Sequence, residues 1–559
     1  MSAIQTVKKI GLFSLRGILI TFEIIIGLLF LLVLYMMLSS KISPPDVNEI
    51  KIGKREKVGE NHYVLGDNWL RKNEQGIWEM YIEGAPYERG LIYGELAKEL
   101  VQKQEKIFVG QIDNFVPSKG WQRVLQLMIG FFNKDLPENI QLENQQEIYG
   151  ISKAFSDDYD YISTKYGRIL NYHAAHDIGH ALNDYSMVGC SSFALKGHKS
   201  FGGKLMVGRN FDFYVGDDFA EEKIILFLKP DKGHAFVSYS WAGFTGVASG
   251  LNIKGLSVTI NASKSDLPTS TKTPISLLAR EILQYASTID EAIAIAKKRE
   301  TFVSETIMVA SKIDGKAVLI EKSPTKMGVY DSGSDELICA NHYQSQTFLM
   351  DSSNIQNIIE SDSHYRYAKI KTMLADQDSL STLDAVAILR SQLGINNDTL
   401  GMGNPRAVNQ LIAHHSVVIL PEQLLFYAST NDYQLGEYKG YDLEKIFAAK
   451  EIHSPNQLPE DAFIHSQSYA KFKEFKKTKK KITAFLMFDK KLEITDNQAY
   501  SFIQTNSESF VSYEILGKYY LKKGRKDLAK KQFEIALTKK VASLAIEKEL
   551  ENLIKKCEE

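Results

Sequence analysis

The sequence predicts an α+β protein of more than one domain, tethered to a membrane by an N-terminal helix. Three observations support this prediction. An apolar run lies near the start, helix-period and strand-period segments form separate blocks in the middle, and a lysine-rich helical segment ends the 559 residues. Strands that cluster around a helical block favour a layered α+β domain over a regular alternation of strand and helix.

The apolar run covers residues 18–38 and matches the ~20 residues that cross ~30 Å of hydrocarbon. Lys8, Lys9 and Arg16 precede it, and such a basic flank stays in the cytoplasm. We therefore expect a single-pass membrane protein with a cytoplasmic N-terminus, in which everything after Lys41 is extracytoplasmic, either periplasmic or extracellular. A cleaved signal peptide is the alternative, but the run exceeds the ~7–15 apolar residues of a signal peptide and no A-x-A-like site follows it.

The chain before the strand-rich block divides into two expected segments. Residues 1–44 form the cytoplasmic stub and the transmembrane anchor. Residues 45–189 form a linker and a helical N-terminal segment, because apolar positions recur every three to four residues from 87 to 115 and from 161 to 182.

Residues 190–445 form the expected catalytic domain, in which short β-rich runs are bounded by turn residues. Helices are predicted at 273–286 and 288–300 from their helical apolar spacing. Strands are predicted at KIILFLK, HAFVSYS, GLSVTIN, ETIMVASK, KAVLIEK, HSVVIL and QLLFYAS.

Residues 446–559 form the expected helical, lysine-rich tail. Small and aromatic residues in it occupy tetratricopeptide-type positions, namely Tyr513, Leu516, Gly517, Tyr520, Ala529, Phe533 and Ala536. One such repeat is too short for a stable solenoid, so the tail either caps the catalytic domain or receives a protein partner.

Charge and cysteine content narrow the function. The 67 basic and 68 acidic residues nearly balance, so we expect no nucleic-acid partner and no strongly acidic substrate, and small neutral or amphipathic ligands remain open. Cys190, Cys339 and Cys557 lie too far apart for a disulfide framework or a thiolate metal site. Cys339 is expected to be buried in a strand, and Cys557 lies in the charged tail, which leaves Cys190 as the cysteine whose neighbours suggest chemistry.

Cys190 lies between a glycine and two serines in the segment GCSSF. A thiol with an unperturbed pKa of ~8.5 is mostly protonated at neutral pH, so a nucleophilic cysteine needs a base. A histidine is one candidate. The other is the α-amine of Cys190 itself, with a pKa of ~7.7–8.0, which cleavage of the Gly189–Cys190 bond would release.

Ordered motifs favour the α-amine. IEGAPYERGLIYGELAKE precedes GCSSF, and GRNFDF, WAGFTGVASGLNIKGLSVTINAS and CANHY follow it. With these motifs the chain resembles the N-terminal-nucleophile hydrolases of the acyl-coenzyme A:6-aminopenicillanic-acid acyltransferase type, which are related to choloylglycine hydrolases and acid ceramidases. The resemblance covers residues 80 to 445, roughly.

The resemblance implies that Cys190 is the nucleophile and that self-cleavage after Gly189 exposes it. Asp212 would orient the new α-amine, and Arg209 would steady the thiolate. Asn341 of CANHY would donate a hydrogen bond to the oxyanion, a contact whose loss costs about 10²–10³ in rate.

Three more residues match the family less closely. Asn261 in TINAS is a second candidate oxyanion donor. The family has a further functional arginine late in its sequence, which would contact the substrate or a charged group. Arg406 in GNPRAVNQ and Arg366 in SHYRYAKI are both candidates for it, and either could instead be an ordinary surface or helix arginine.

Two groups of histidines have structural interpretations. His173, His176 and His180 share one helical face, but no HExxH pattern accompanies them, so we favour a polar helix face over a metal site. His414 and His415 begin an apolar strand and are expected to be core residues rather than bases.

The resemblance implies a four-layer αββα sandwich and a reaction through an acyl-Cys190 intermediate, without a cofactor. The expected substrate is a linear amide whose carbon–nitrogen bond is not a peptide bond. Phe211, Phe213, Trp241 and Phe244 suit either an apolar acyl chain or a core. An acyltransferase that passes the acyl group to an amine is one alternative, and an inactive membrane-tethered scaffold is the alternative from another class.

Overall fold

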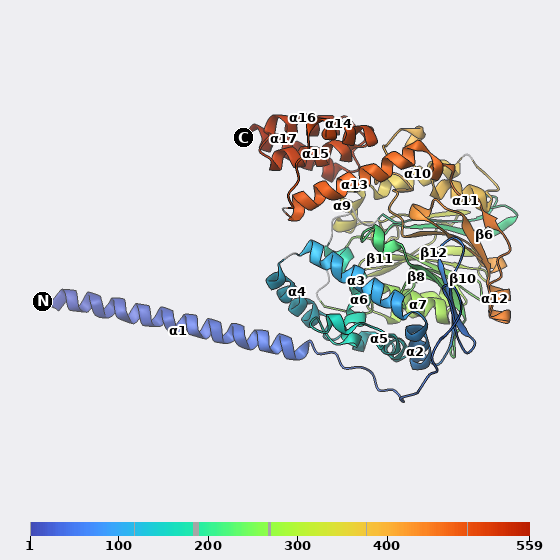
Figure 1. Ribbon diagram of the computed structural model, residues 1–559, viewed down its shortest axis with the longest axis horizontal. Coiled ribbons are helices and arrows are strands. Elements are labelled where there is room, and N and C mark those ends of the chain that lie inside the picture. Colours follow the sequence, from blue (N-terminus) through green and yellow to red (C-terminus); the bar gives the residue numbers. More distant parts are fainter. Residues whose placement is uncertain (1, 117, 183–188, 267–269, 376, 489) are drawn as a thin grey trace.

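The computed structural model of the chain describes all residues except 1, 117, 183–188, 267–269, 376 and 489. The predicted mixed α+β fold is confirmed. A long helix, α1 (Ser2–Ser39), leads into a body of two β-sheets with helices beside them, and further helices form the C-terminal end (Figure 1).

The segment Ile20–Ser39 of α1 has a mean hydropathy of 2.5, and none of it is buried in the protein. At 1.5 Å per residue its 20 residues reach about 30 Å, the thickness of the hydrocarbon layer. The segment therefore has the length and composition of a membrane span, and an N-terminal signal sequence shares both properties.

Within the described residues, the larger sheet has 11 strands in the order β1-β2-β3-β4-β7-β8-β9-β10-β11-β12-β13. Strand β4 runs parallel to β7, whereas hairpin neighbours such as β11 and β12 are antiparallel. The bounds are β1 Glu56–Gly59, β2 His62–Leu65, β3 Asn68–Lys72, β4 Trp78–Gly84, β7 Lys223–Pro230, β8 Phe236–Trp241, β9 Ser249–Asn252, β10 Leu256–Ala262, β11 Glu305–Ser311, β12 Lys316–Lys322 and β13 Met327–Tyr330.

The first four of these strands correct the expectation of a linker and helices over residues 45–189. Strands β1 to β4 form a meander that extends the larger sheet. Strand β4, WEMYIEG, lies between β3 and β7 and its first five residues are buried, so it lacks the alternation of a half-exposed strand. The strands β1 and β2 hold four residues each, too few for a clear period.

The smaller sheet has seven strands in the described chain, in the order β14-β5-β6-β15-β16-β17-β18. Their bounds are β5 Ser191–Gly197, β6 Gly203–Phe211, β14 Glu336–Cys339, β15 His415–Leu420, β16 Leu425–Ser429, β17 Tyr438–Asp442 and β18 Gln457–Leu458. All seven strand runs predicted after Cys190 are found as strands of the two sheets.

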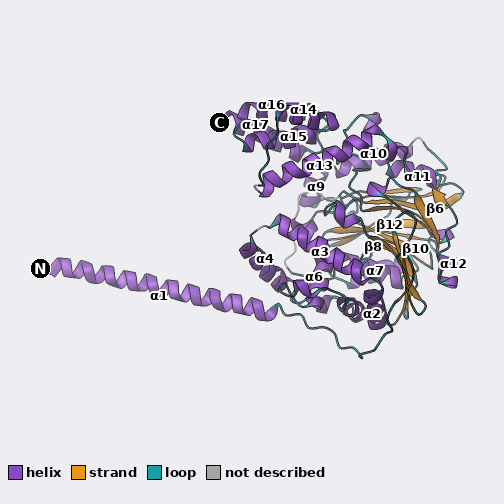
Figure 2. Cartoon of the chain, viewed as in Figure 1, coloured by secondary structure: helices purple, strands orange, loops and turns teal. Residues whose placement is uncertain are grey.

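Helices lie beside both sheets (Figure 2). They are α2 Pro86–Leu96, α3 Lys98–Phe115, α4 Lys119–Phe132, α5 Leu142–Ser152, α6 Lys165–Leu182, α7 Ile275–Tyr285, α8 Ile289–Lys298, α9 Ser352–Glu360, α10 Ser363–Ala375, α11 Thr382–Leu389 and α12 Leu443–Ala449. One core joins the larger sheet to α2, α5, α6 and α7, a second contains residues of both sheets, and a third joins the smaller sheet to α10 and α11.

The tail consists of α13 Gln467–Phe488, α14 Asp496–Thr505, α15 Phe510–Lys522, α16 Lys526–Leu537 and α17 Leu544–Glu558, which share a core of their own. A Cβ atom on Gly517 of α15 would lie 2.5 Å from the ring of Phe533 in α16, so this helix crossing requires glycine. The tail is bonded to the body, because the Asn506 amide donates to the Met402 carbonyl oxygen over 2.8 Å and accepts from its N–H.

Candidate active site

The candidate nucleophile lies at the start of β5. Strand β5 pairs with β6 so that Ser192 is opposite Arg209, and the alternation of side chains turns both residues toward the larger sheet. Cys190, two residues before Ser192, shares that direction, and its side chain is 1% exposed. Arg209 Nη2 lies 3.8 Å from Cys190 Sγ and donates to it.

The larger sheet fixes the Arg209 guanidinium. Nη1 donates to Ser249 Oγ of β9 over 2.5 Å, and Nη2 donates to the carbonyl oxygen of Ile260 in β10. The guanidinium carbon also lies 4.3 Å from the centre of the Phe211 ring. A charge held on three sides keeps one position relative to the sulfur of Cys190.

Asp212 follows β6 directly and is fully buried. Burial raises the pKa of its carboxyl to about 7, against the opposing charges of Arg366 and Arg209. Burial also raises the pKa of the Cys190 thiol to about 11, because desolvation outweighs the charge of Arg209. In the uncleaved chain the thiol is therefore protonated at neutral pH, and the Asp212 carboxyl keeps its proton to a higher pH than an exposed aspartate does.

A glutamine far along the chain contacts the bond that precedes Cys190. Gln410 Nε2 donates to the carbonyl oxygen of Gly189 over 2.7 Å and to Asp212 Oδ2 over 3.3 Å. The Gly189 N–H donates in turn to the carbonyl oxygen of Asp212 over 3.1 Å. A Cβ atom on Gly189 would lie 2.1 Å from Gln410 Nε2, so glycine allows the amide to approach this carbonyl group.

Arg366 and Asn341 complete the cluster. Arg366, buried in α10, donates from Nη1 to the carbonyl oxygen of Cys190 and from Nη2 to Asn341 Oδ1, each over 2.7 Å. Asn341 Nδ2 donates to the carbonyl oxygen of Ala262 over 2.8 Å. One described bond thus uses one of the two amide hydrogens of Asn341, which fits a side chain with a further donor.

The structure separates the two candidate arginines. Arg366 contacts Cys190 directly, whereas Arg406 donates from Nε to the carbonyl oxygen of Ala542 over 2.9 Å and lies 4.9 Å from the centre of the Tyr365 ring. Arg406 therefore belongs to the contact between the body and the tail.

The side chain of Asn261 is hydrogen-bonded to Ser192, two residues after Cys190, and its oxygen and its amide nitrogen both have protein partners. Its Oδ1 accepts from Ser192 Oγ over 2.8 Å, and its Nδ2 donates to the carbonyl oxygens of Cys339 and Ala340 over 3.3 and 3.1 Å. Both amide hydrogens therefore point to the strand end that carries Asn341. In this arrangement Asn261 joins β10, β5 and β14 and has no hydrogen left for an oxyanion.

The histidine pair lies behind Arg209. His415 Nε2 accepts from Ser249 Oγ over 2.9 Å, and the Nδ1 atoms of His414 and His415 are 2.9 Å apart. Arg209 Nη1 also lies 3.5 Å from His415 Nε2, and because a guanidinium carries only donors, His415 Nε2 is the acceptor in these contacts. Burial lowers the pKa of both histidines well below the ordinary value, so both are neutral supports of Arg209, as expected of core residues.

His173 has two protein partners in the helix layer. Its Nε2 accepts from the Thr245 N–H over 3.0 Å, and its Nδ1 contacts the Ile169 carbonyl oxygen over 2.8 Å. The expected face shared with His176 and His180 lies outside the described side chains.

Four aromatic residues form a row beside Arg209. Ring centres are 5.6 Å apart for Phe211 and Phe213, 6.0 Å for Phe213 and Trp241, and 4.2 Å for Trp241 and Phe244. The row provides an apolar wall next to the cluster.

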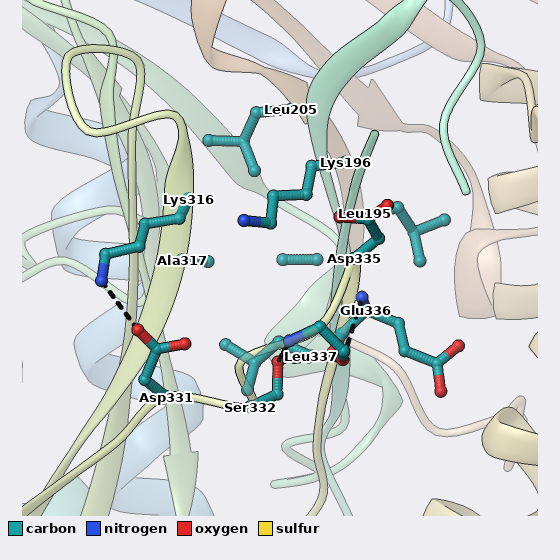
Figure 3. Close-up of a pocket in the computed structure, with 12 residues that line it drawn as sticks. Leu195, Lys196, Leu205, Lys316, Ala317, Asp331, Ser332, Asp335, Glu336 and Leu337 are labelled. Carbon is teal, nitrogen blue, oxygen red and sulfur yellow. Dashed lines mark hydrogen bonds and ion pairs between the residues drawn. The ribbon is translucent and has the colours of Figure 1, made fainter. Parts of the chain in front are cut away.

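A surface pocket at the other end of β5 is distinct from this cluster (Figure 3). Its wall includes Lys196, Glu336 and the ion pair of Lys316 with Asp331, whose charged atoms are 2.7 Å apart. Its described lining contains none of the residues that contact Cys190.

The solved structures that match this chain are distant from it in sequence and in structure. A Caenorhabditis elegans ortholog of N-acylethanolamine-hydrolyzing acid amidase is 19% identical, with a TM-score of 0.31, over 42% of this chain and 93% of its own. A mutant conjugated bile acid hydrolase from Clostridium perfringens is 17% identical, with a TM-score of 0.32, over 48% and 96%. Penicillin V acylase from Agrobacterium tumefaciens is 14% identical, with a TM-score of 0.24, over 49% and 91%.

Sequence comparison gives a relative and a family. An uncharacterized protein of Archaeoglobus fulgidus is 28% identical over 240 residues, which make up 40% of this chain and 39% of that protein, so the chain spans about two fifths of its relative. Residues 200–398 match the family described as acyl-coenzyme A:6-aminopenicillanic acid acyl-transferase. The matched segment contains Arg209, Asp212 and Arg366 and begins after Cys190, so the resemblance indicated by the sequence is confirmed over residues 200–398.

Proposed function

We propose that the protein is an N-terminal-nucleophile amidohydrolase that cleaves its own Gly189–Cys190 bond and then acts on linear amides through an acyl-Cys190 intermediate. One observation carries the proposal. The thiol of Cys190 lies beside the Arg209 guanidinium, and the carbonyl group of the preceding residue, Gly189, accepts a hydrogen bond from Gln410. Nucleophile, cation and polarised carbonyl group thus meet at a single peptide bond.

Self-cleavage begins with attack of Cys190 Sγ on the Gly189 carbonyl carbon. The sulfur–carbon bond forms, the carbon–nitrogen bond breaks, and the thiol proton ends on the departing nitrogen, which gives a thioester and a free α-amine. Asp212, with a pKa raised by burial to about 7, is the carboxylate available to relay that proton. Water then hydrolyses the thioester and restores the thiol.

Turnover uses the new amine as the base for the thiol. Asp212 Oδ1 has no hydrogen-bond partner among the described residues, so it is available to hold the α-amine of Cys190. Arg209 stabilises the thiolate, and Asn341, oriented by Arg366, donates to the oxyanion of the substrate. Because Cys190 is 1% exposed in the uncleaved chain, a substrate reaches the sulfur only after residues that cover it have moved.

The row of aromatic rings favours a substrate with an apolar acyl chain, since such a wall excludes water and contributes contact area. The family description favours acyl transfer to an amine as the second candidate reaction. The two reactions share the acyl-Cys190 intermediate and differ in whether water or an amine accepts the acyl group.

The proposal includes the architecture expected for this class: an αββα sandwich anchored by α1 with the catalytic domain outside the cytoplasm, and a tetratricopeptide-like tail. Two sheets with a shared core and helices on their outer faces support the sandwich. The close crossing at Gly517 supports the repeat-like tail.

Intact-mass measurement of the purified full chain tests the proposal. Fragments that end at Gly189 and begin at Cys190 are expected for the natural sequence and are absent from Cys190→Ala. Assays with N-acyl amino acids, bile-salt-like amides and β-lactams, with and without added amine, then distinguish hydrolysis from transfer. An intact natural chain with no turnover would instead favour the membrane-tethered scaffold.

A further inference from the structure

Helix α4 exposes apolar side chains to solvent, and none of its residues is buried. Five apolar side chains, spaced three and four residues apart along one side of the helix, are exposed to solvent: Trp121, Val124, Leu125, Met128 and Ile129. The Trp121 side chain is 64% exposed. A continuous apolar face of this kind marks an interaction surface rather than an ordinary surface helix.

The last turn of α1 touches the C-terminal end of α4. The rings of Tyr35 and Phe131 are 5.8 Å apart in an edge-to-face arrangement. A Cβ atom on Gly130 would lie 3.0 Å from Ser40 Cβ, so the two segments are in close contact. Figure 1 shows α4 at the edge of the body beside the end of α1.

The contact between α1 and α4 sets the position of α4 relative to the membrane. Tyr35 lies near the outer end of the segment Ile20–Ser39, where aromatic residues of a span meet the headgroup region. A helix that packs against this end lies at the membrane surface. An amphipathic helix in that position buries its apolar face about 5–10 Å into the boundary between headgroups and acyl chains.

We propose that α4 lies in the outer surface of the bilayer, with the five apolar side chains among the lipids, so that α1 and α4 attach the catalytic domain at two points. The inference rests on the membrane anchoring in the proposed function and is independent of the chemistry at Cys190. Two attachments restrict rotation of the domain about α1, which a single span leaves free.

Quenching of Trp121 fluorescence tests this inference. The full chain is reconstituted into phosphatidylcholine vesicles with either ordinary or acyl-chain-brominated lipid. The chain has four tryptophans, of which Trp78 and Trp241 are 6% and 8% exposed and Trp69 is half-buried. Brominated lipid is expected to quench part of the emission, and Trp121→Phe should abolish that part while Trp69→Phe leaves it.

A second variant tests the apolar face itself. Val124→Glu with Met128→Glu should reduce quenching by brominated lipid and increase quenching of Trp121 by aqueous acrylamide. Phe201→Glu is the matched control, because Phe201 is 71% exposed in the turn between β5 and β6 and does not belong to α4.

Each outcome decides the inference. Quenching of Trp121 by acrylamide but not by brominated lipid overturns it in favour of a water-facing helix, and protection from both quenchers overturns it in favour of a protein partner. Loss of the chain from floated vesicles overturns the anchor of the proposed function together with the docking of α4. Self-cleavage, measured by intact mass on the same samples, reports separately on the chemistry.

Discussion

Substitution of Gln410 by leucine tests the mechanism of self-cleavage most directly. Gln410 is 4% exposed, and its amide bonds both the carbonyl oxygen of Gly189 and the carboxyl of Asp212. Leucine has a similar volume and no donor, so Gln410→Leu removes both hydrogen bonds without opening a large cavity.

The expected effect follows from the change in charge at the Gly189 oxygen. This oxygen gains negative charge when sulfur attacks, so a donor at 2.7 Å stabilises the transition state more than the ground state. Loss of one donor of this kind costs about 10²-fold in rate. We therefore expect Gln410→Leu to slow appearance of the fragment that begins at Cys190 by about 10²-fold.

The assay follows the intact chain and its fragments by mass after synthesis. Gln434→Leu is the matched control, because Gln434 is also buried and donates from Nε2 to a backbone carbonyl oxygen, that of Leu389, over 2.7 Å. The control should lower the melting temperature and leave the cleavage rate unchanged. Equal cleavage rates in Gln410→Leu and the natural sequence would refute the reasoning, whereas failure of the natural chain to cleave would refute self-processing itself.

Three further predictions concern charge, guanidinium geometry and the tail. In a Cys190→Ala background, Asp212→Asn should raise the melting temperature at pH 8. Burial raises the pKa of Asp212 from 3.8 to about 7, so this carboxyl lowers stability as pH rises between those values, and the gain should vanish in scans near pH 4. Arg366→Lys should reduce the rates of both cleavage and turnover by at least about tenfold, since one ammonium group cannot replace the two hydrogen bonds that Arg366 donates to Cys190 and Asn341. Arg406→Lys should leave both rates unchanged and alter only stability. Gly401 has a φ of +81°, and a Cβ atom on it would lie 2.4 Å from a backbone nitrogen of the tail. Gly401→Ala should therefore lower the melting temperature in calorimetry by several degrees without slowing cleavage. An unchanged melting temperature would contradict the described contact between the body and the tail.

The fold was predictable where local pattern and environment agree. The strand Lys223–Pro230 is apolar from Ile224 to Leu228 because it lies between two neighbouring strands and between two layers. Thr288 and Glu291 form a capping box that starts α8 at Ile289, a signal present in the sequence itself. The meander β1 to β4 lacked such signals, because β1 and β2 hold four residues each and β4 is buried between β3 and a strand distant in sequence, β7.

The site was predictable where it is contiguous. Gly189, Cys190, Arg209 and Asp212 lie on one hairpin and its flanks, so a short motif carries their geometry. Gln410 reaches the same point from a segment 221 residues from Gly189, and no periodicity or spacing connects the two. The choice between candidate late arginines depends likewise on packing, which a single sequence does not encode locally.

The uncleaved site explains why processing would have to precede activity. A buried thiol with a pKa of about 11 is a weak nucleophile toward an external substrate, yet it lies beside one internal carbonyl group that is already hydrogen-bonded. Proximity compensates for low thiolate content in a reaction within the chain, because the reacting groups pay no entropy of association. Cleavage then supplies a base at the nucleophile and frees the position that Gly189 occupied. On the proposed mechanism, the arrangement that protects the thiol before cleavage is the one that prepares it for a single internal reaction.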